Sequence, residues 1–579
     1  MAVRVRVPLA APIKFLLILT MRKQLIFFAS ACSLLALASC SKLGALSADN
    51  FNVDPTPLET QGGKVPTTIN GTFPVKYMKK KAVVTVTPEL RYADGKVAKG
   101  QSATFQGEKV MGNDQTISYK QGGRYTMKTS FDYVPDMQKS DLYLTFDARI
   151  GKKEQKVPEV KVGYGVVATS ELYKETLMNA GGVIAPDSFQ RVKEQKYQAN
   201  IKFLINQANL RKSELKNNSV KEFVKLLKSI NADKEGLNLR NVEVAAYASP
   251  DGGFKFNDKL ASKRQNTSEA YVKQQLKAAK LASANVDAHY TAQDWEGFQE
   301  LVQASNIQDK DVILRVLSMY KDPEEREQQI RNMSATFQEL ADGILPELRR
   351  SRLIINYETI GRSDEEIDAQ YKEDASKLSA DELLYYASLQ KDYAKQQEVY
   401  KKTAELYPND YRPVNNLAVL ALRNQNEVDM KDYLNQALAK DPKAGEPQAN
   451  LALLSLRNGN VAEAEANLSK TMDANKFQEV LGNLNIAKGD YAAAEQNFKN
   501  SNTNSAALAQ ILNKNYAAAV ATLQNVENKD AMTDYLTAIV LNRQGNTATA
   551  KEALQRAISA DSKLAAYAAN DLEVANLMK

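Results

Sequence analysis

A repeat of 34 residues constrains this chain more than any other feature of its sequence. The stretches NNLAVLALRNQNEVDMKDYLNQALAKDP and ANLALLSLRNGNVAEAEANLSKTMDAN align at that spacing, so that Asn416 matches Asn450 and Arg423 matches Arg457. Within each copy, apolar residues recur at helical spacing on both sides of a short turn. Each copy therefore predicts a helix, a turn and a second helix, and stacked pairs of this kind form a superhelix with a concave inner surface.

A period of 34 residues with this pattern resembles the tetratricopeptide repeat. We predict an all-α solenoid of six repeats over residues 378–579, with the fifth shortened. In the family pattern Asn416 and Asn450 face the concave surface, where an amide can pair with a peptide backbone. We expect these asparagines, with Arg423 and Arg457 nearby, to bind a segment of a partner protein. The alternative is that they form hydrogen bonds within the repeats or are solvated polar positions.

The N-terminus predicts a secreted protein with a lipid anchor. From Met21 the sequence MRKQLIFFASACSLLALASC combines two cations, an apolar run and small residues before Cys40, the order of a secretory signal peptide. We assign residues 1–39 to this signal, and a true start at Met21 stays open. Residues 37–40 resemble the bacterial lipobox, which implies that Cys40 is acylated and attaches the mature chain to a lipid bilayer.

The cysteine count and the net charge argue against disulfide bonds and against nucleic-acid binding. The chain has two cysteines, and Cys32 lies in the segment predicted to be removed, so the mature chain has no disulfide. Removing residues 1–39 takes away five cations and leaves 71 basic against 69 acidic residues. This balance, without a clustered basic face, predicts no nucleic-acid partner.

The sequence predicts neither an enzyme nor a cofactor. A single histidine, His289, is too few for a histidine triad or a His-rich zinc site, and no Walker or Rossmann glycine pattern occurs. We predict that His289 belongs to a strand. The carboxylates of Asp294, Glu296 and Glu300 are predicted to form a solvated helix face, with Trp295 as a core anchor.

The first part of the mature chain predicts β-structure. Residues 40–65 are polar, contain proline and glycine, and predict a lipidated cysteine followed by a tether. The next predicted domain spans residues 66–190. From about residue 66 to residue 170 its periodicity is two, as in DLYLTFDARI, where Leu142, Leu144 and Phe146 share one face. Turn signals such as Asp94-Gly95 separate these runs. We predict an antiparallel β-sandwich that acts as a spacer or docking module.

Residues 195–362 alternate between strand and helix patterns. YQANIKFLIN, RNVEVAAYAS and SRLIINYETIG read as strands, and SVKEFVKLLKSI as an amphipathic helix. A second helix, NDKLASKRQNTSEAYVKQQL, is predicted to begin with Asn257 as its N-cap. The stretch from Asp294 onward, DWEGFQELVQASNIQDKDVILRVLSMYKDPEEREQQI, predicts a helical insertion.

The turn YASPDGGFKFNDKLASKR and the late LRRSRLIINY resemble the OmpA C-terminal-like domain. That resemblance implies a site for the diaminopimelate of peptidoglycan, in which an aspartate holds the ammonium and a helix arginine holds the carboxylate. Here Ser249 stands at the aspartate position, and Asp251 is the nearest carboxylate. The candidate residues are Ser249, Asp251, Gly252, Asn257, Arg264, Arg349 and Arg350. A different polar ligand and a purely structural turn both stay open as alternatives.

The sequence therefore predicts a multidomain chain: an all-β sandwich, an α/β OmpA-like domain and an all-α tetratricopeptide solenoid. This combination resembles outer-membrane lipoproteins of Bacteroidota. It implies a scaffold anchored in the outer membrane on the periplasmic side, with possible peptidoglycan contact and protein partners bound by the repeats. The alternative is a subunit of a secretion, fimbrial or outer-membrane assembly machine that binds no peptidoglycan.

Overall fold

The computed structural model describes residues 42–178, 181–307, 309–332 and 338–578, so the predicted signal peptide and Cys40 lie outside the described residues. The chain divides into two compact units. The first unit combines Met1–Gly181 with Gln448–Lys579, and the second spans Gly182–Pro447. The division falls inside helix α16 (Gly445–Arg457), in the middle of the predicted repeats.

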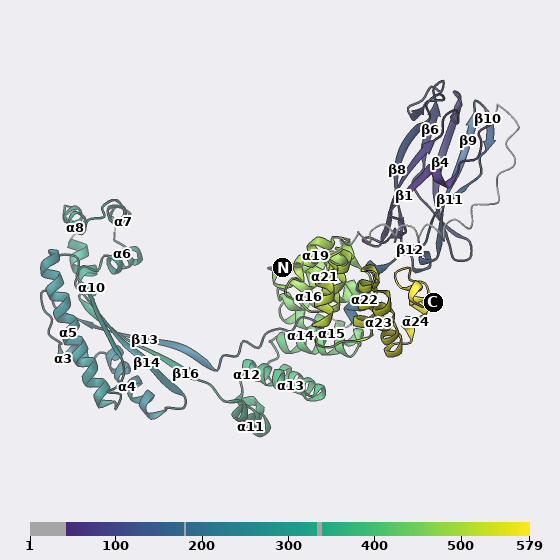
Figure 1. The fold of residues 1–579 in the computed structure, drawn as a ribbon. Helices are drawn as coiled ribbons and strands as arrows, with labels where there is room; N and C mark the ends of the chain where they lie inside the picture. The colour runs from purple at the N-terminus through teal and green to yellow at the C-terminus, as the bar shows by residue number, and fades with distance from the viewer. Residues whose placement is uncertain (1–41, 179–180, 308, 333–337, 579) are drawn as a thin grey trace, which may run out of the picture. The chain divides into compact units, whose positions relative to one another are not determined.

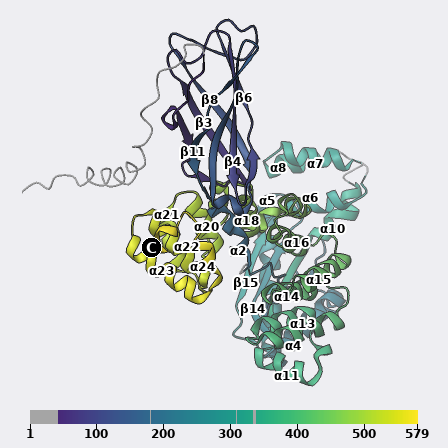
Figure 2. The ribbon, with the colours of Figure 1, turned by 90° about the vertical axis from the view of Figure 1, so that its right-hand side faces the viewer.

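Two sheets form the β-rich part of the first unit (Figure 1, Figure 2). The smaller sheet has the order β1-β3-β8: β1 (Phe51–Asp54), β3 (Lys64–Phe73) and β8 (Gly123–Asp132). The larger sheet has the order β10-β9-β4-β6-β7, with β11 also paired to β9 and β5 to β4: β4 (Ala82–Tyr92), β5 (Lys96–Lys99), β6 (Ala103–Gly107), β7 (Gln115–Ile117), β9 (Ser140–Ile150), β10 (Lys153–Lys156) and β11 (Val160–Tyr164). Leu142 and Leu144 of β9 are buried in the core between the sheets, on the face that the alternating pattern predicts.

The structure differs from the predicted tether over residues 40–65. Leu43 and Leu46 are buried in the sandwich core, and β1 pairs with β3. A short strand β2 (Leu58–Glu59) pairs with β12 (Val166–Val167). The polar, proline-containing composition concealed these few apolar anchors, which are enough to hold the segment on the domain.

The sandwich also ends earlier than the predicted residue 190. After β12 the chain forms the short helices η4 (Thr169–Leu172) and α2 (Tyr173–Met178). Both helices pack against helices α18 and α20 of the same unit, so residues 169–178 belong with the repeats rather than with the sheets.

A four-stranded sheet of order β13-β16-β14-β15 organises the α/β domain of the second unit: β13 (Val192–Lys202), β14 (Leu237–Tyr247), β15 (Val286–Thr291) and β16 (Arg350–Ile360). Only β14 and β15 run parallel to each other. Helices α4 (Asn218–Ala232) and α5 (Phe254–Ala278) pack on this sheet and share one core with it. His289 lies in β15, as the sequence predicts.

The insertion before β16 is helical and has a core of its own. Its elements are α6 (Trp295–Ala304), α7 (Lys310–Met319), α8 (Pro323–Arg331), η5 (Leu340–Ile344) and α10 (Leu345–Leu348). Trp295 packs against this core, with its ring at a steep angle to that of Phe298, consistent with the predicted anchor.

Six consecutive helix pairs follow, preceded by α11 (Asp364–Asp374), in agreement with the six predicted repeats (Figure 1). The pairs are α12 (Ala380–Leu389) with α13 (Tyr393–Leu406), α14 (Arg412–Arg423) with α15 (Glu427–Lys440), α16 with α17 (Val461–Leu468), α18 (Gln478–Lys488) with α19 (Tyr491–Asn497), α20 (Asn504–Leu512) with α21 (Tyr516–Gln524), and α22 (Ala531–Arg543) with α23 (Thr547–Ala560). Small residues at the close approaches, Ala437, Ala464 and Ala550, are fully buried. Among the described residues, no helix joins enough length to enough apolar character to cross a membrane.

Candidate functional site

The predicted ligand turn joins β14 to α5 in the second unit. Helix α5 begins at Phe254 with Gly253 as its N-cap, so the prediction that Asn257 caps the helix is wrong. Asn257 is instead buried inside the turn, where its Nδ2 donates to the carbonyls of Ser249, at 2.9 Å, and Gly252, at 2.8 Å. One amide therefore ties the start of the helix back to the two residues that shape the turn.

The only carboxylate of the turn is already paired within the chain. Arg349 Nη2 lies 3.1 Å from Asp251 Oδ2, and its Nε lies 3.3 Å from Ser249 Oγ. The Ser249 hydroxyl in turn donates to Asp251. The side chains of Asp251 and Arg349 are only 17% and 12% exposed. A ligand ammonium at Asp251 would have to compete with a largely buried guanidinium.

Arg264, the predicted partner of a ligand carboxylate, is 0% exposed. Its guanidinium donates to three carbonyls, those of Gln207 at 2.9 Å, Tyr247 at 2.8 Å and Leu204 at 3.3 Å. Burial, with the nearby charge of Arg349, lowers the pKa of Arg264 to about 10, so it stays protonated at neutral pH. Because three fixed acceptors hold this cation, the geometry favours the structural alternative for Arg264.

The two late arginines do not act as a pair. Whereas Arg349 reaches Asp251, Arg350 Nη2 lies 3.1 Å from Asp294 Oδ2, and Arg350 Nη1 donates to the Glu347 carbonyl at 2.8 Å. Asp294 is buried and also caps α6 through the Gly297 N–H, at 2.9 Å. Burial raises the pKa of Asp294, against the attraction of Arg350.

The prediction of a solvated acidic face is therefore wrong for Asp294. Sequence reasoning missed this buried ion pair because its partners lie 56 positions apart. The cavity that described residues form beside the turn is small. The cavity beside Asp251, which Trp295 and Phe298 also line, measures about 10 Å³, room for about one water molecule.

A second polar site lies on α14, also in the second unit, where the predicted backbone-binding asparagine meets the chain's own backbone. Asn416 is buried, its Oδ1 accepts the N–H of Ala185 at 2.8 Å, and its Nδ2 donates to the carbonyl of the same residue at 3.1 Å. Asn415 Nδ2 donates to the Val183 carbonyl at 2.9 Å, and Arg412 Nη1 to the Asp187 carbonyl at 2.9 Å. In each of these hydrogen bonds the segment 183–187 contributes a main-chain atom.

The other three predicted partner-binding residues lie on α14 and α16. Arg423 is exposed at the last position of α14. Asn450 is buried in α16 and Arg457 ends that helix, and both belong to the first unit.

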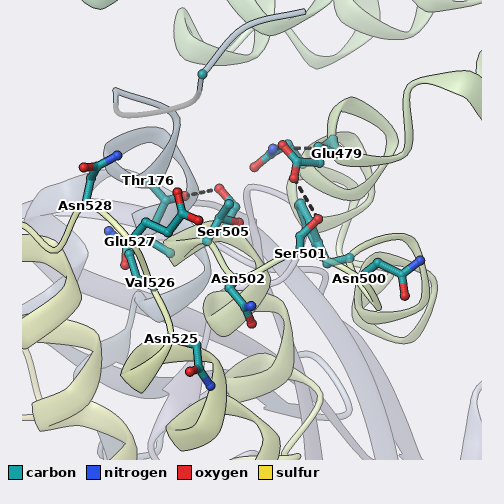
Figure 3. A pocket seen from close by; sticks show the side chains of 15 residues that line it. Thr176, Glu479, Asn500, Ser501, Asn502, Ser505, Asn525, Val526, Glu527 and Asn528 are labelled. Carbon is teal, nitrogen blue, oxygen red and sulfur yellow. Dashed lines mark hydrogen bonds between the residues drawn. The ribbon is translucent and has the colours of Figure 1, made fainter. Parts of the chain in front are cut away.

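Sequence reasoning missed a pocket of about 410 Å³ in the first unit, between the N-terminal ends of α18 and α20 and the turn before α22 (Figure 3). Glu479 Oε1 accepts the Ser501 hydroxyl at 2.7 Å. Asn483 Nδ2 donates to the Glu479 carbonyl at 2.9 Å, whereas its Oδ1 has no hydrogen-bond partner. The only sequence signal was the Asn- and Ser-rich composition of residues 499–505 and 525–528, which is also typical of ordinary turns.

Across the described ranges, no three His, Cys, Asp or Glu side chains gather as metal ligands would.

Neither a protein-family model nor a curated protein matches this sequence. Among solved structures, the chain is similar to a tetratricopeptide repeat protein from Parabacteroides merdae, with 14% identity, a TM-score of 0.27, and coverage of 44% of this chain and 98% of that one. It is also similar to pilF of Pseudomonas aeruginosa (15% identity, TM-score 0.25, 34% of this chain and 93% of that one) and to yeast Tom70 (12%, 0.23, 63% and 86%). The assignment of the helical region to tetratricopeptide-like repeats rests on the six helix pairs themselves.

Proposed function

We propose that this protein is a non-enzymatic scaffold whose helical repeats bind extended polypeptide segments of partner proteins. The observation that carries the proposal is the pairing of Asn416 with both main-chain groups of Ala185. Because Asn416 forms these hydrogen bonds with the N–H and the carbonyl of the main chain, an extended segment of another protein can present the same two groups. The segment 183–187 then acts as an internal occupant that a partner replaces.

The proposal includes a lipid anchor at Cys40 and a place on the periplasmic face of the outer membrane. It is supported by the lipobox-like residues 37–40, by Ser41 after the cysteine, and by the lack of an acidic run in SKLGALS. An anchor raises the local concentration of whatever the repeats bind. Labelling with a palmitate analogue followed by membrane fractionation tests this part, and Cys40→Ser is expected to abolish labelling and release the protein.

The α/β domain enters the proposal as a structural or protein-binding module of an envelope machine rather than as a peptidoglycan anchor. The support is that Asp251 and Arg264, the two groups a diaminopimelate would need, are both held by internal partners. We expect no Asp251-dependent co-sedimentation with purified sacculi. Retention of the wild-type chain that Asp251→Asn abolishes would restore the peptidoglycan hypothesis.

The test of the proposed binding surface on α14 first removes its internal occupant, the segment 183–187. In the full mature chain, residues 183–187 are replaced by a Gly-Ser stretch of equal length, and a fluorescein-labelled peptide GGVIAPDSFQ, the sequence of residues 181–190, is added. We expect saturable binding by fluorescence anisotropy. Adding Asn416→Ala should weaken it about tenfold, because the peptide loses a two-point hydrogen bond.

The matched control is Asn435→Ala, an exposed asparagine on the neighbouring helix α15. Circular dichroism of each variant reports whether the emptied chain keeps its helices. A folded, emptied chain that fails to bind the peptide, or binds it equally well with Asn416→Ala, would contradict the proposal.

A further inference from the structure

The pocket between α18, α20 and the turn before α22 has an unusual lining for a ligand site. Its volume of about 410 Å³ falls within the usual range for small-ligand pockets, which are mostly apolar. Here amide, hydroxyl and carboxylate side chains predominate, and Phe498, the only aromatic residue of the lining, is itself buried. The pocket therefore suits a polar ligand and offers no ring face on which a base could stack.

The charges of the lining exclude an anion. Glu479 and Glu527 line the pocket, and no Lys, Arg or His is among its described lining residues. Lys499 and Lys529 lie close in sequence but outside the lining, and neither forms an ion pair in the described structure. Figure 3 shows Glu527 near Thr176 and Ser505, and Glu479 with Ser501 across the pocket. A phosphate or carboxylate would be repelled from both sides, whereas a cation would be attracted from both.

Asn483 adds a second, independent indication of a ligand. This asparagine of α18 lines the pocket and is 3% exposed, and its Oδ1 accepts no hydrogen bond. A buried polar atom without a partner costs about 1–3 kcal/mol, so such atoms are uncommon unless something else supplies the donor. The missing group is a hydrogen-bond donor, which agrees with the negative lining.

A segment of the chain itself, helix α2, already packs on α18 and α20, the helices that form the pocket. Thr176 of α2 lines it, and the hydroxyls of Thr176 and Ser505 are 3.0 Å apart. The segment that crosses α18 and α20 thus reaches the edge of the pocket, and Gly181 lines it as well. A polypeptide on these helices is in position to place one side chain in the pocket.

We propose that this pocket receives a lysine or arginine side chain of an extended partner polypeptide, with the cation between Glu479 and Glu527 and a donor directed at Asn483. The inference rests on the proposed function, since it names the chemistry of a partner that the repeats bind. It proposes recognition of a partner side chain in the first unit, in addition to the main-chain recognition proposed for α14 in the second unit.

Saturation-transfer difference NMR on the full mature chain tests this directly, because the method detects weak small ligands on a large protein. The probes are Nα-acetyl-lysine methylamide and the matched Nα-acetyl-norleucine methylamide, which lacks the ammonium. The variant is Glu479→Gln with Glu527→Gln, and the control is Glu463→Gln with Glu552→Gln, two exposed carboxylates outside the pocket. All four changes replace a carboxylate by an amide of the same shape.

We expect the lysine probe to bind the wild type and the control equally, and the double variant about fivefold more weakly, the scale for exposed ion pairs. The norleucine probe should bind the wild type more weakly by a similar factor. No binding of the lysine probe, equal binding of both probes, or unchanged binding by the double variant would overturn the inference. The peptide of residues 181–190 contains no lysine or arginine, so its binding in the groove is decided separately.

Discussion

The turn between β14 and α5 and the pocket beside α18 are both rich in residues that bind polar ligands, yet they differ in what those residues already hold. In the turn, Asp251 is paired with Arg349, and Arg264 donates to three carbonyls. In the pocket, within the part of the chain that the structure describes, Asn483 keeps an unused acceptor and the lining includes no Lys, Arg or His. The difference shows that the residue types of a motif do not by themselves indicate a ligand site, because the groups that their polar atoms already contact decide what a ligand would have to replace.

Two asparagines in the repeats sharpen the same contrast. Asn416 of α14 and Asn483 of α18 are both buried in the first helix of a pair. The amide of Asn416 is satisfied by the backbone of Ala185, whereas Oδ1 of Asn483 has no hydrogen-bond partner among the residues that the structure describes. The repeat that contains α14 thus shows how an asparagine binds a main-chain segment. The repeat that contains α18 has a hydrogen-bond acceptor that a ligand could use.

The largest expected effect is on the turn. Arg264→Met should destabilise the α/β domain by about 3–5 kcal/mol, because three carbonyls lose the buried guanidinium that donates to them. Hydrogen–deuterium exchange of β14 and α5 measures this locally, which suits a multidomain chain. The control is Lys263→Met, an exposed neighbour on the same helix. If Arg264 were held in reserve for a ligand, both variants would exchange like the wild type.

A second prediction concerns a buried carboxyl of the first unit. Asp571 is fully buried, and its Oδ2 accepts the Tyr535 hydroxyl at 2.8 Å. Burial raises its pKa from 3.8 to about 6, so between these values the folded chain binds more protons than the unfolded chain. The contribution of Asp571 to the free energy of unfolding is therefore greatest below pH 3.8, falls as the pH rises toward 6, and is constant above it, a change on the order of 3 kcal/mol.

Asp571→Asn removes this titration while keeping a polar group beside Tyr535. We expect the denaturant midpoint of the variant to depend less on pH between 4 and 6 than that of the wild type. Glu552→Gln, at an exposed carboxylate of α23, should keep the wild-type dependence. Parallel pH profiles for Asp571→Asn and the wild type would show that burial does not raise the pKa of Asp571, and would contradict the prediction.

Local periodicity predicted the elements of this fold well. The 34-residue spacing identifies the helix pairs, and the alternation around Leu142 and Leu144 identifies β9, because both patterns depend on residues a few positions apart. The sites were harder to predict. Whether Asp294 is solvated depends on Arg350, and whether Asn416 is free depends on Ala185, which lies 231 positions away. Such pairings are set by tertiary packing, which no local pattern contains.

An effect of intermediate size is expected for the segment 183–187, which α14 holds. Asn416→Ala in the otherwise unchanged chain removes two hydrogen bonds to Ala185 and should loosen the segment 183–187 by about 1–3 kcal/mol. The expected result is faster amide exchange and easier proteolysis within that segment, while the helices of the repeats stay protected. Asn435→Ala should change neither. Slower or unchanged exchange would mean that the segment is held by other contacts and that Asn416 is not its principal clamp.

The smallest expected effect is at the pocket. Glu479→Gln with Glu527→Gln should change the free energy of unfolding by less than about 0.5 kcal/mol, because both side chains are exposed and an amide oxygen can still accept the Ser501 hydroxyl. Chemical denaturation and exchange of α18 and α20 measure it. A loss as large as that expected for Arg264→Met would show that these carboxylates hold the repeats together. If the double variant is as stable as the wild type but binds the lysine probe more weakly, the two carboxylates contribute to binding and not to folding. In the turn between β14 and α5 the two contributions cannot be separated in this way, because its charged groups are already held by internal partners.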